Sequence, residues 1–345
     1  MDSMTTAPAF PPPDRAATAL VALDWGTSSL RAFAMSADGR VLEQRDSAHG
    51  ILNLPAPGGI AGFERAFAEA CGDWLARRPG LPVVAGGMVG SAQGWKEAPY
   101  VATPADTATL ATRAAAVTTA EGVRILIAPG VLHDPADGVP DVMRGEEIQI
   151  AGALVRAPRA LRRSRLVLPG THSKWVEVVD GRIVRFATFM TGELFAILRR
   201  HSILGRLMPE AAAPEPDAAA AAFAAGLRAA DGRVLAHDLF AVRTLGLMRR
   251  LSGDVLEDYL SGLLIGHELA GARALGAAEP DVPVVLIGEG RLSRRYAEAL
   301  RLTGIPVTAE LGNTAPDGLF RFAVAAGLVD EPQGRQQETI DVRPA

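Results

Sequence analysis

The 345-residue chain carries 35 basic and 39 acidic residues, which gives a formal net charge of −4 at pH 7. This balance, without a long basic run, disfavours a nucleic-acid surface and favours a small-molecule ligand. The single cysteine, Cys71, excludes an internal disulfide framework, and no stretch approaches the roughly 20 uninterrupted apolar residues of a membrane span. We therefore expect a cytoplasmic protein that binds neither nucleic acid nor membrane. A homodimer is a possible assembly.

The length suits two lobes with a site in the cleft between them. Residues 1–17 are rich in proline and alanine and lack the features of a signal peptide, so we expect a disordered tail. We expect an N-terminal lobe over 18–160, a C-terminal lobe over 161–330 and a C-terminal tail over 331–345. The low-complexity run at 209–222 predicts a mobile surface excursion.

One plan of strands and turns occurs twice in the chain. Residues 18–49 predict a strand, a glycine-containing turn, a second strand, a tight Asp-Gly turn and a third strand. Residues 165–190 repeat this order, with a Gly-Thr-x-Ser core at 170–173 that matches the one at 26–29. The duplication predicts two lobes of related build.

Alternating helix and strand signals follow each copy. After the first copy, an apolar stripe over 63–74 predicts a helix, and 81–90 and 123–131 predict buried strands. The segment 141–154 then predicts an amphipathic helix. After the second copy we expect helices near 191–204, 237–249 and 254–275, and then a strand at 282–288, a helix over 289–304, a strand at 305–310 and a last segment over 315–329. The whole pattern is that of an α/β protein.

The two Gly-Thr-x-Ser turns predict anion binding. A tight turn between two strands directs successive N–H groups inward, where they hold phosphate oxygens, and hydroxyl side chains add donors. Two such turns facing each other across a cleft would hold a polyphosphate, and Asp24 beside the first could hold a hydrated Mg²⁺. One loop alone could equally be an ordinary hairpin with a capping aspartate; the duplicate favours phosphate.

A third glycine loop, Gly288-Glu289-Gly290, follows a predicted buried strand and begins a helix. Glycine there lets a flat ligand such as an adenine nucleotide approach the backbone. On this motif alone a plain strand-to-helix turn is the default interpretation. The P-loop and the full G-x-G-x-x-G fingerprint are absent from this neighbourhood, which disfavours those nucleotide folds.

Phosphoryl transfer also needs a carboxylate that accepts or orients the proton of the acceptor hydroxyl. The segment 141–154 offers Asp141, Glu146 and Glu147, and it precedes the second lobe, so its first helical turn should face the cleft. We prefer Glu146, followed by Asp141 and Glu147. The alternative is that Glu146 and Glu147 only complement the helix dipole.

Lysine is rare: Lys96 and Lys174 are the two among 35 basic residues. An ammonium is a compact charge that a guanidinium does not copy, so both positions are candidates for function. The alternatives are a surface position for Lys96 and a strand position for Lys174, paired with Glu177 or Glu193.

The stretch 86–100 is dense in glycine, polar and aromatic residues and follows a predicted buried strand, as a substrate loop would. Within it, Lys96 could neutralise a substrate carboxylate, and a tryptophan could supply a flat wall. Its candidate substrate contacts, together with the tryptophan of the first turn, are Trp25, Gly87, Met88, Gln93, Trp95, Lys96, Glu97 and Tyr100.

With these segments in view, the chain resembles the 2-dehydro-3-deoxygalactonokinase family, within the superfamily of sugar kinases, actin and Hsp70-type ATPases. The motifs that carry the resemblance span roughly residues 19–330: LDWGTSSLR, GGMVGSAQGWKEAPY, DVMRGEEIQIAGAL, LPGTHSKWV, FMTGELFAILRRHSIL and VVLIGEGRLSRRYAEAL. The resemblance implies a two-lobed actin-like ATPase fold, with ribonuclease H-like lobes of mixed β-sheet flanked by helices and an active site in the interlobe cleft.

The resemblance also implies an activity. It is the transfer of a phosphoryl group from ATP, with Mg²⁺, to the C6 hydroxyl of 2-dehydro-3-deoxy-D-galactonate, giving 2-dehydro-3-deoxy-6-phosphogalactonate in galactonate catabolism. Asp24, Asp141 and Glu146 are the implied catalytic residues, with Asp24 at the metal. The implied ATP-binding residues are Gly26, Thr27, Ser28, Ser29, Arg31, Gly170, Thr171, His172, Ser173, Lys174, Gly288, Glu289 and Gly290.

Two departures and three rival functions stay open. Sugar kinases commonly have Gly-Asp where this chain has Gly145-Glu146, and their adenosine loops often have paired glycines where Glu289 separates two here. The rivals are a kinase for another keto-deoxy sugar acid or aldonate, an ATP or polyphosphate hydrolase with the same loops, and a non-catalytic sugar sensor. Release of ADP that depends on the acceptor would separate the kinase from the hydrolase.

Overall fold

The computed structural model describes residues 18–210, 214–230, 234–276 and 282–332. The chain forms two compact units: unit 1 holds the described residues of 1–100, 107–130 and 315–345, and unit 2 those of 101–106 and 131–314. This division differs from the expected lobe boundary at residue 160, because residues 131–160 group with unit 2 and those after 314 return to unit 1. The expected tail at 1–17, and most of that at 331–345, lie outside the described residues.

Unit 1 contains a six-stranded sheet in the order β3-β2-β1-β4-β7-β6. β1 (Thr18–Trp25), β2 (Leu30–Ser36) and β3 (Val41–Ser47) are antiparallel neighbours, as the first copy of the repeat predicts. β4 (Val83–Gly86) and β7 (Arg124–Ile127) continue the sheet parallel to β1, and β6 (Ala115–Thr118) pairs antiparallel with β7.

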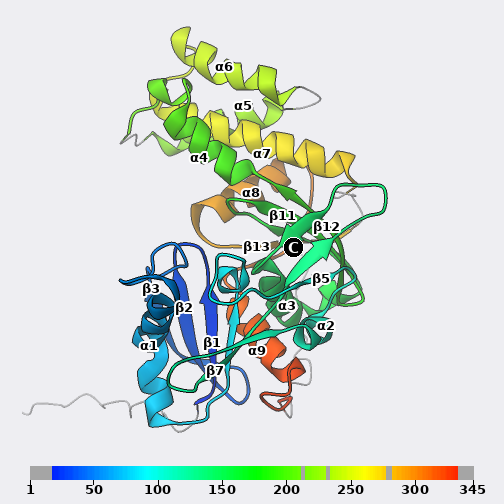
Figure 1. Cartoon of the computed structure of the whole chain (residues 1–345). Helices are drawn as coiled ribbons and strands as arrows, with labels where there is room; N and C mark the ends of the chain where they lie inside the picture. The colour runs from blue at the N-terminus through cyan, green and yellow to red at the C-terminus, as the bar shows by residue number, and fades with distance from the viewer. Residues whose placement is uncertain (1–17, 211–213, 231–233, 277–281, 333–345) are drawn as a thin grey trace, which may run out of the picture. The chain divides into compact units, whose positions relative to one another are not determined.

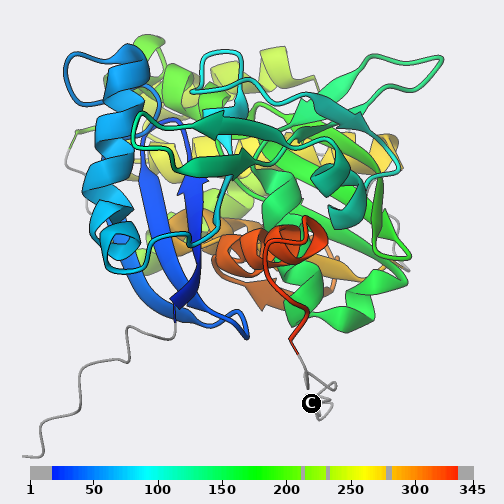
Figure 2. The same ribbon diagram turned by 60° about the horizontal axis from the view of Figure 1, so that its bottom comes forward.

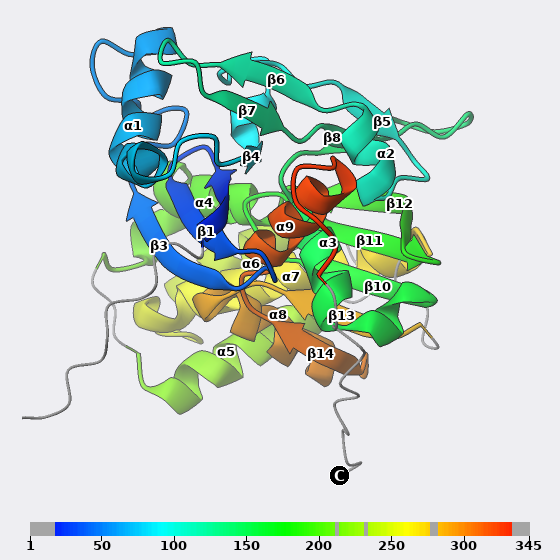
Figure 3. The same cartoon turned by 90° about the horizontal axis from the view of Figure 1, so that it is seen from below.

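Helices cover both faces of this sheet. α1 (Gly59–Arg77) packs on β2 and β3, and α9 (Ala315–Ala325) packs on β1 and β4 and contacts the short α2 (Thr107–Thr112). Figures 2 and 3 show α1 and α9 beside the strands, on opposite faces of the sheet. Because successive side chains of a strand alternate between faces, β1 is apolar on both sides, with Leu20 to Leu23 fully buried. The predicted α1 stripe is confirmed, since Phe63, Phe67, Ala70 and Trp74 are buried.

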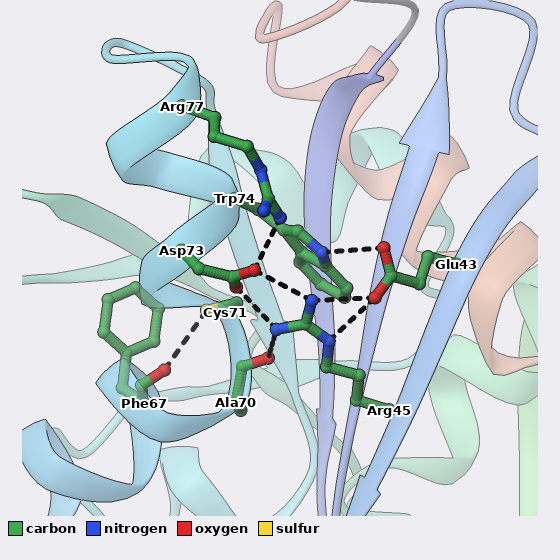
Figure 4. A network of polar contacts seen from close by, with 8 residues as sticks. All are labelled: Glu43, Arg45, Phe67, Ala70, Cys71, Asp73, Trp74 and Arg77. Carbon is green, nitrogen blue, oxygen red and sulfur yellow. Dashed lines mark hydrogen bonds and ion pairs between the residues drawn. The ribbon is translucent and has the colours of Figure 1, made fainter. Parts of the chain in front are cut away.

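A polar network joins α1 to β3 (Figure 4). The Arg45 guanidinium donates to Glu43 Oε1 at 2.7 Å and to Asp73 Oδ1 at 2.5 Å, and lies 4.3 Å from the centre of the Trp74 ring. The Trp74 indole N–H donates to the other oxygen of Glu43 at 3.0 Å. The network fixes α1 across β3, the edge strand of the sheet.

Unit 2 repeats the same topology in a five-stranded sheet of order β12-β11-β10-β13-β14. β10 (Arg163–Leu168), β11 (Ser173–Val179) and β12 (Arg182–Phe189) are antiparallel neighbours, and β13 (Val284–Ile287) and β14 (Val307–Leu311) extend the sheet in parallel. This order matches β3-β2-β1-β4-β7, strand for strand. The predicted repeat and the α/β actin-like ATPase fold of mixed sheets flanked by helices are confirmed.

Five helices of unit 2 lie on one side of its sheet (Figure 1): α4 (Thr191–His201), α5 (Pro216–Ala229), α6 (Leu235–Leu247), α7 (Leu256–Ala274) and α8 (Gly290–Leu302). The expected surface excursion at 209–222 is wrong from residue 216, where the alanine-rich run forms α5. Glycines explain why this helix packs tightly on α7: a Cβ on Gly226 would lie 2.1 Å from Tyr259 O, and one on Gly262 would lie 2.0 Å from Phe223 O.

A third, three-stranded sheet combines β5 (Tyr100–Ala102), β8 (Gly130–His133) and β9 (Asp141–Met143). The helix expected from residue 141 begins later, as α3 (Glu146–Arg156), because residues 141–143 pair with β8. Asp141 ties β9 to β12 by accepting bonds from Thr188 N at 2.6 Å and Thr188 Oγ1 at 2.7 Å. Among the described residues, no helix is both long and apolar enough to cross a membrane.

Candidate active site

The first glycine loop joins β1 to β2. Gly26 N donates to Ser29 O at 2.9 Å, which closes a tight turn and leaves the side chains of Thr27 to Ser29 exposed. Asp24, one residue before the end of β1, lies opposite Arg31 on β2, with 3.4 Å between its Oδ2 and the guanidinium Nη2. Burial raises the pKa of Asp24, and the charge of Arg31 opposes this rise. The end of β1 thus presents a carboxylate next to a row of exposed hydroxyls.

A glycine that the sequence motifs did not single out supports this loop from behind. A Cβ on Gly50 would lie 2.4 Å from the backbone of Ser28 and Ser29. The next two residues hold the loop as well, because Ile51 N donates to Gly26 O and Leu52 N donates to Thr27 O, both at 3.1 Å. Gly50 is the third residue after the end of β3.

The second glycine loop, between β10 and β11, is supported in the same way. A Cβ on Gly192 would lie 2.3 Å from Gly170 O, and Glu193 N donates to Thr171 O at 2.9 Å. Gly192 is the third residue after the end of β12, so the duplicated design includes the supporting glycine. Its sequence motif was part of the resemblance, but nothing in the motif indicated this contact.

The two copies of the loop differ in whether their hydroxyl side chains are exposed or buried. Thr171 and His172 are exposed, whereas Ser173 is fully buried and donates to Glu268 Oε2 at 2.7 Å. The Ser173 hydroxyl therefore belongs to the interior of unit 2 and does not face an open site, contrary to the expected role as a phosphate donor.

Lys174 is buried and joins this loop to α3. Its Nζ lies 3.1 Å from Glu146 Oε1 and donates to His172 O at 3.2 Å. The alternative that Lys174 pairs with Glu177 or Glu193 is wrong. The ion pair connects two segments that the sequence singled out separately, one for phosphate and one for the catalytic carboxylate.

The three candidate carboxylates now separate. Glu146 retains 24% side-chain exposure and accepts a bond from Arg144 N at 3.0 Å. Glu147 is buried, and Gly145 N donates to both of its carboxylate oxygens, at 2.9 and 2.7 Å. Burial, and then the negative charge of Glu146, raise the pKa of Glu147 to about 8. Both carboxylate oxygens of Asp141 accept hydrogen bonds from Thr188. Glu146 differs from the other two because it is partly exposed and forms an ion pair with Lys174.

A cavity of about 310 Å³ opens within unit 2 between the second glycine loop, α4, α7 and α8. One part of its wall is apolar and another is charged, a combination common in small-molecule sites. Its lining residues are Gly170, Thr171, Thr191, Gly192, Phe195, Glu257, Ser261, Leu264, Ile265, Arg291, Leu292 and Arg295.

The predicted adenosine loop borders α8 but does not line this cavity. Glu289 directs its carboxylate to the backbone, where Oε1 accepts a bond from Asn313 N at 2.9 Å. Gly288 N donates to Leu311 O at 2.9 Å, so both residues serve the local turn. The cavity is lined instead by Arg291 and Leu292, directly after Gly290.

The predicted substrate loop is a compact, hydrogen-bonded segment of unit 1. Ala98 N donates to Gly90 O at 2.9 Å, and a Cβ on Gly94 would lie 2.1 Å from Val89 O. Gln93, Lys96, Glu97 and Tyr100 are exposed, whereas Met88 is partly buried against the core. Gly87 adopts φ +94°, and a Cβ there would lie 2.8 Å from Trp25 O, so this loop packs against the end of β1.

The two tryptophans proposed as substrate contacts lie in the core of unit 1. Trp25 is fully buried and donates from its indole to His49 O at 2.8 Å. Trp95 stacks on Phe63 with 5.7 Å between ring centroids and an interplanar angle of 11°. Both rings are used for packing, so they anchor the loops and do not form an open wall.

The family model for 2-keto-3-deoxy-galactonokinase matches residues 24–322. The chain belongs to this family. The matched residues include both glycine loops, the predicted substrate loop and α3 of this 2-keto-3-deoxy-galactonokinase family member.

Relatives agree with this assignment. The chain is 39% identical over 290 residues to "Probable 2-dehydro-3-deoxygalactonokinase DgoK1" of Rhizobium meliloti (strain 1021), covering 84% of this chain and 90% of that one. It is 38% identical over 300 residues to the 2-dehydro-3-deoxygalactonokinase of Escherichia coli (strain K12), covering 86% and 94%. A solved structure, "a putative 2-dehydro-3-deoxygalactonokinase protein from Sinorhizobium meliloti", has a TM-score of 0.78 at 38% identity and covers 89% and 98%.

Proposed function

We propose that this member of the 2-keto-3-deoxy-galactonokinase family transfers the γ-phosphoryl group of ATP to the C6 hydroxyl of 2-dehydro-3-deoxy-D-galactonate. The product is 2-dehydro-3-deoxy-6-phosphogalactonate, in galactonate catabolism. The observation that carries the site assignment is the Lys174–Glu146 ion pair, at 3.1 Å, which joins the second glycine loop to the candidate base. The family match supports the substrate, since both named relatives are 2-dehydro-3-deoxygalactonokinases.

The nucleotide is assigned to unit 2. The apolar wall formed by Phe195, Leu264 and Leu292 suits the faces of an adenine ring, and Glu257 and Ser261 offer partners for ribose hydroxyls. Gly170 and Thr171 border the same cavity and carry the loop to which phosphates are assigned. Backbone N–H groups of both glycine loops and the exposed hydroxyls of Thr27 to Ser29 are the proposed phosphate donors.

The first loop has the chemistry for a magnesium ion. Mg²⁺ keeps several waters and takes one or two carboxylates, so a partly exposed Asp24 among exposed hydroxyls is a fitting ligand set. Arg31 limits the negative charge there, which favours an ion shared with phosphate oxygens over one bound by the protein alone. When bound, the ion would neutralise charge on the phosphate oxygens.

Glu146 is the proposed general base. The C6 oxygen attacks the γ-phosphorus, the bond from that phosphorus to the β-γ bridging oxygen breaks, and ADP departs while the C6 proton passes to Glu146. Lys174 Nζ, 3.1 Å from Glu146 Oε1, orients this carboxylate beside the second glycine loop. In unit 1, exposed Lys96 is the proposed partner of the carboxylate of the sugar acid.

The test is Glu146→Gln, which preserves volume and removes the basic oxygen. We expect kcat to fall about 10²-fold or more, because a positioned base contributes about that much. ADP affinity, measured by calorimetry, should stay within about threefold of the wild-type value. The matched control is Glu69→Gln, at an exposed position of α1. A kcat near that of the control would remove Glu146 from the role of base.

A substrate panel tests the rest of the proposal. Purified protein, ATP and Mg²⁺ are combined with 2-dehydro-3-deoxy-D-galactonate, with other keto-deoxy sugar acids and aldonates, or with no acceptor. We expect ADP release to depend on the acceptor and to be fastest with the galactonate derivative. Equal release without acceptor would favour a hydrolase, and preference for another sugar acid would change the substrate.

A further inference from the structure

Unit 2 contains a buried carboxylate that the proposed mechanism does not use. Glu268 lies on α7, is 2% exposed, and accepts hydrogen bonds from three other elements. Ser173 Oγ donates to its Oε2 at 2.7 Å, and Trp175 Nε1 donates to its Oε1 at 2.8 Å, both from β11. Tyr296 on α8 donates to Oε2 at 2.6 Å, and Thr191 at the start of α4 also donates to Oε2.

These partners surround the proposed nucleotide site. Ser173 ends the second glycine loop, and Thr191 lines the cavity next to Gly192, whose backbone supports that loop. Tyr296 follows directly after Arg295, another lining residue on α8. One carboxylate therefore joins the loop, α4, α7 and α8, which are the four segments that enclose the cavity.

The hydrogen-bond partners of Glu268 suit a carboxylate and do not suit an amide. An ionised carboxylate accepts hydrogen bonds and donates none, so it suits the hydroxyls of Ser173, Thr191 and Tyr296, which all have Oε2 as an acceptor; Ser173 Oγ also lies 3.3 Å from Phe189 O. An amide in the same place would present two N–H donors and force some hydroxyls to turn. Burial raises the pKa of Glu268 while the four donors oppose that rise, so the bonds offset part of the cost of burying the group.

From this geometry we infer that Glu268 is a positioning residue for ATP, which fixes the second glycine loop and the start of α4 in the arrangement that binds the nucleotide. The inference rests on the proposed function, because it requires the nucleotide to occupy this cavity. Glu268 touches no substrate and acts through Ser173 and Thr191. Its loss should therefore weaken ATP binding selectively and leave the sugar-acid site in unit 1 intact.

The test is Glu268→Gln in the full-length protein, with Asp238→Asn as matched control. Asp238 is also a buried carboxylate of the helical layer, but it pairs with His267 at 3.0 Å and does not line the cavity. We expect Glu268→Gln to raise the KM for ATP and the Kd for ADP about tenfold, the size of effect that follows from weakening bonds to a charged group. The KM for the sugar acid should stay within about twofold, and the control should leave all three values unchanged.

A second variant covers the case in which Glu268→Gln does not fold. Tyr296→Phe removes one donor to Glu268 and leaves the carboxylate, and it should raise the Kd for ADP about threefold. Folded variants that bind ADP as the wild type does, or an equal rise in both KM values, would overturn the inference while the kinase assignment stands. Wild-type protein that binds no ADP would overturn the assignment and the inference with it.

Discussion

Replacing Gly192 with alanine is the most direct test of the second glycine loop. The substitution adds one methyl group, and the backbone of Gly192 does not adopt the positive φ that an alanine would resist. The new Cβ would lie 2.3 Å from Gly170 O and 2.9 Å from Thr171 Cα. The three nearest atoms to the new Cβ all belong to the loop, so the perturbation acts first on the loop.

The magnitude follows from these distances. An ordinary contact of a Cβ with a neighbouring heavy atom is 3.4–4 Å, so the loop and α4 must separate by about 1 Å. Overpacking of this kind costs about 1–3 kcal/mol, and a misplacement of about 1 Å at a reacting group can cost about 10²-fold in rate. We expect a rise of about tenfold in the KM for ATP and a lower kcat.

Steady-state kinetics with ATP varied, calorimetry with ADP and thermal melting measure the outcome. Gly72→Ala is the control: it lies within α1, its Cβ would lie 3.7 Å from Ala68 Cβ, and it should stabilise the helix by about 0.5–1 kcal/mol. A folded Gly192→Ala protein with the ADP affinity and kcat of the wild type would refute the assignment of phosphate to this loop.

Two further predictions concern titration and the sugar acid. The pKa of Glu147 is raised from 4.5 to about 8, so this carboxyl contributes stability that is fully present below pH 4.5 and is lost as the pH rises to about 8. Urea unfolding from pH 5 to pH 8 should show that Glu147→Gln removes a decline of about 1.4 kcal/mol per pH unit; parallel pH profiles would contradict it. Lys96→Ala should raise the KM for the sugar acid about tenfold and leave the KM for ATP unchanged, with exposed Arg65→Ala as control; an effect confined to ATP would show that Lys96 does not hold the sugar acid.

The sequence allowed the fold to be predicted because the strands of each repeat are short, apolar and separated by glycine turns. The order of the two sheets follows from the duplication, and the α1 stripe follows from helical spacing. The alanine-rich segment did not predict a helix because alanine carries no periodic contrast between polar and apolar positions. What stabilises α5 is its close approach to α7 through Gly226 and Gly262, which composition does not report.

At the candidate site, the sequence indicated which residues could be functional better than it indicated their burial and their partners. The pattern singled out Lys174 and Glu146 separately but did not predict that they pair, because they lie 28 residues apart in the chain. Trp95 was predicted to supply a flat wall for the substrate and Trp25 to contact it, yet each packs in the core. Gly50 and Gly192 were missed as supports because their requirement for glycine arises from contacts between distant segments.

The differences between the two copies of the loop explain how one repeat can supply two functions. Alignment of Gly26 with Gly170 sets buried Leu168 at the position of Asp24, and Leu30 at that of Lys174. The first copy therefore has a carboxylate and exposed hydroxyls, which suit a hydrated cation. The second copy has an ammonium paired with Glu146 and a serine fixed by Glu268, which suit the nucleotide and the proton transfer. The proposed mechanism needs each property once, so it depends on the divergence of the two loops and not on their likeness.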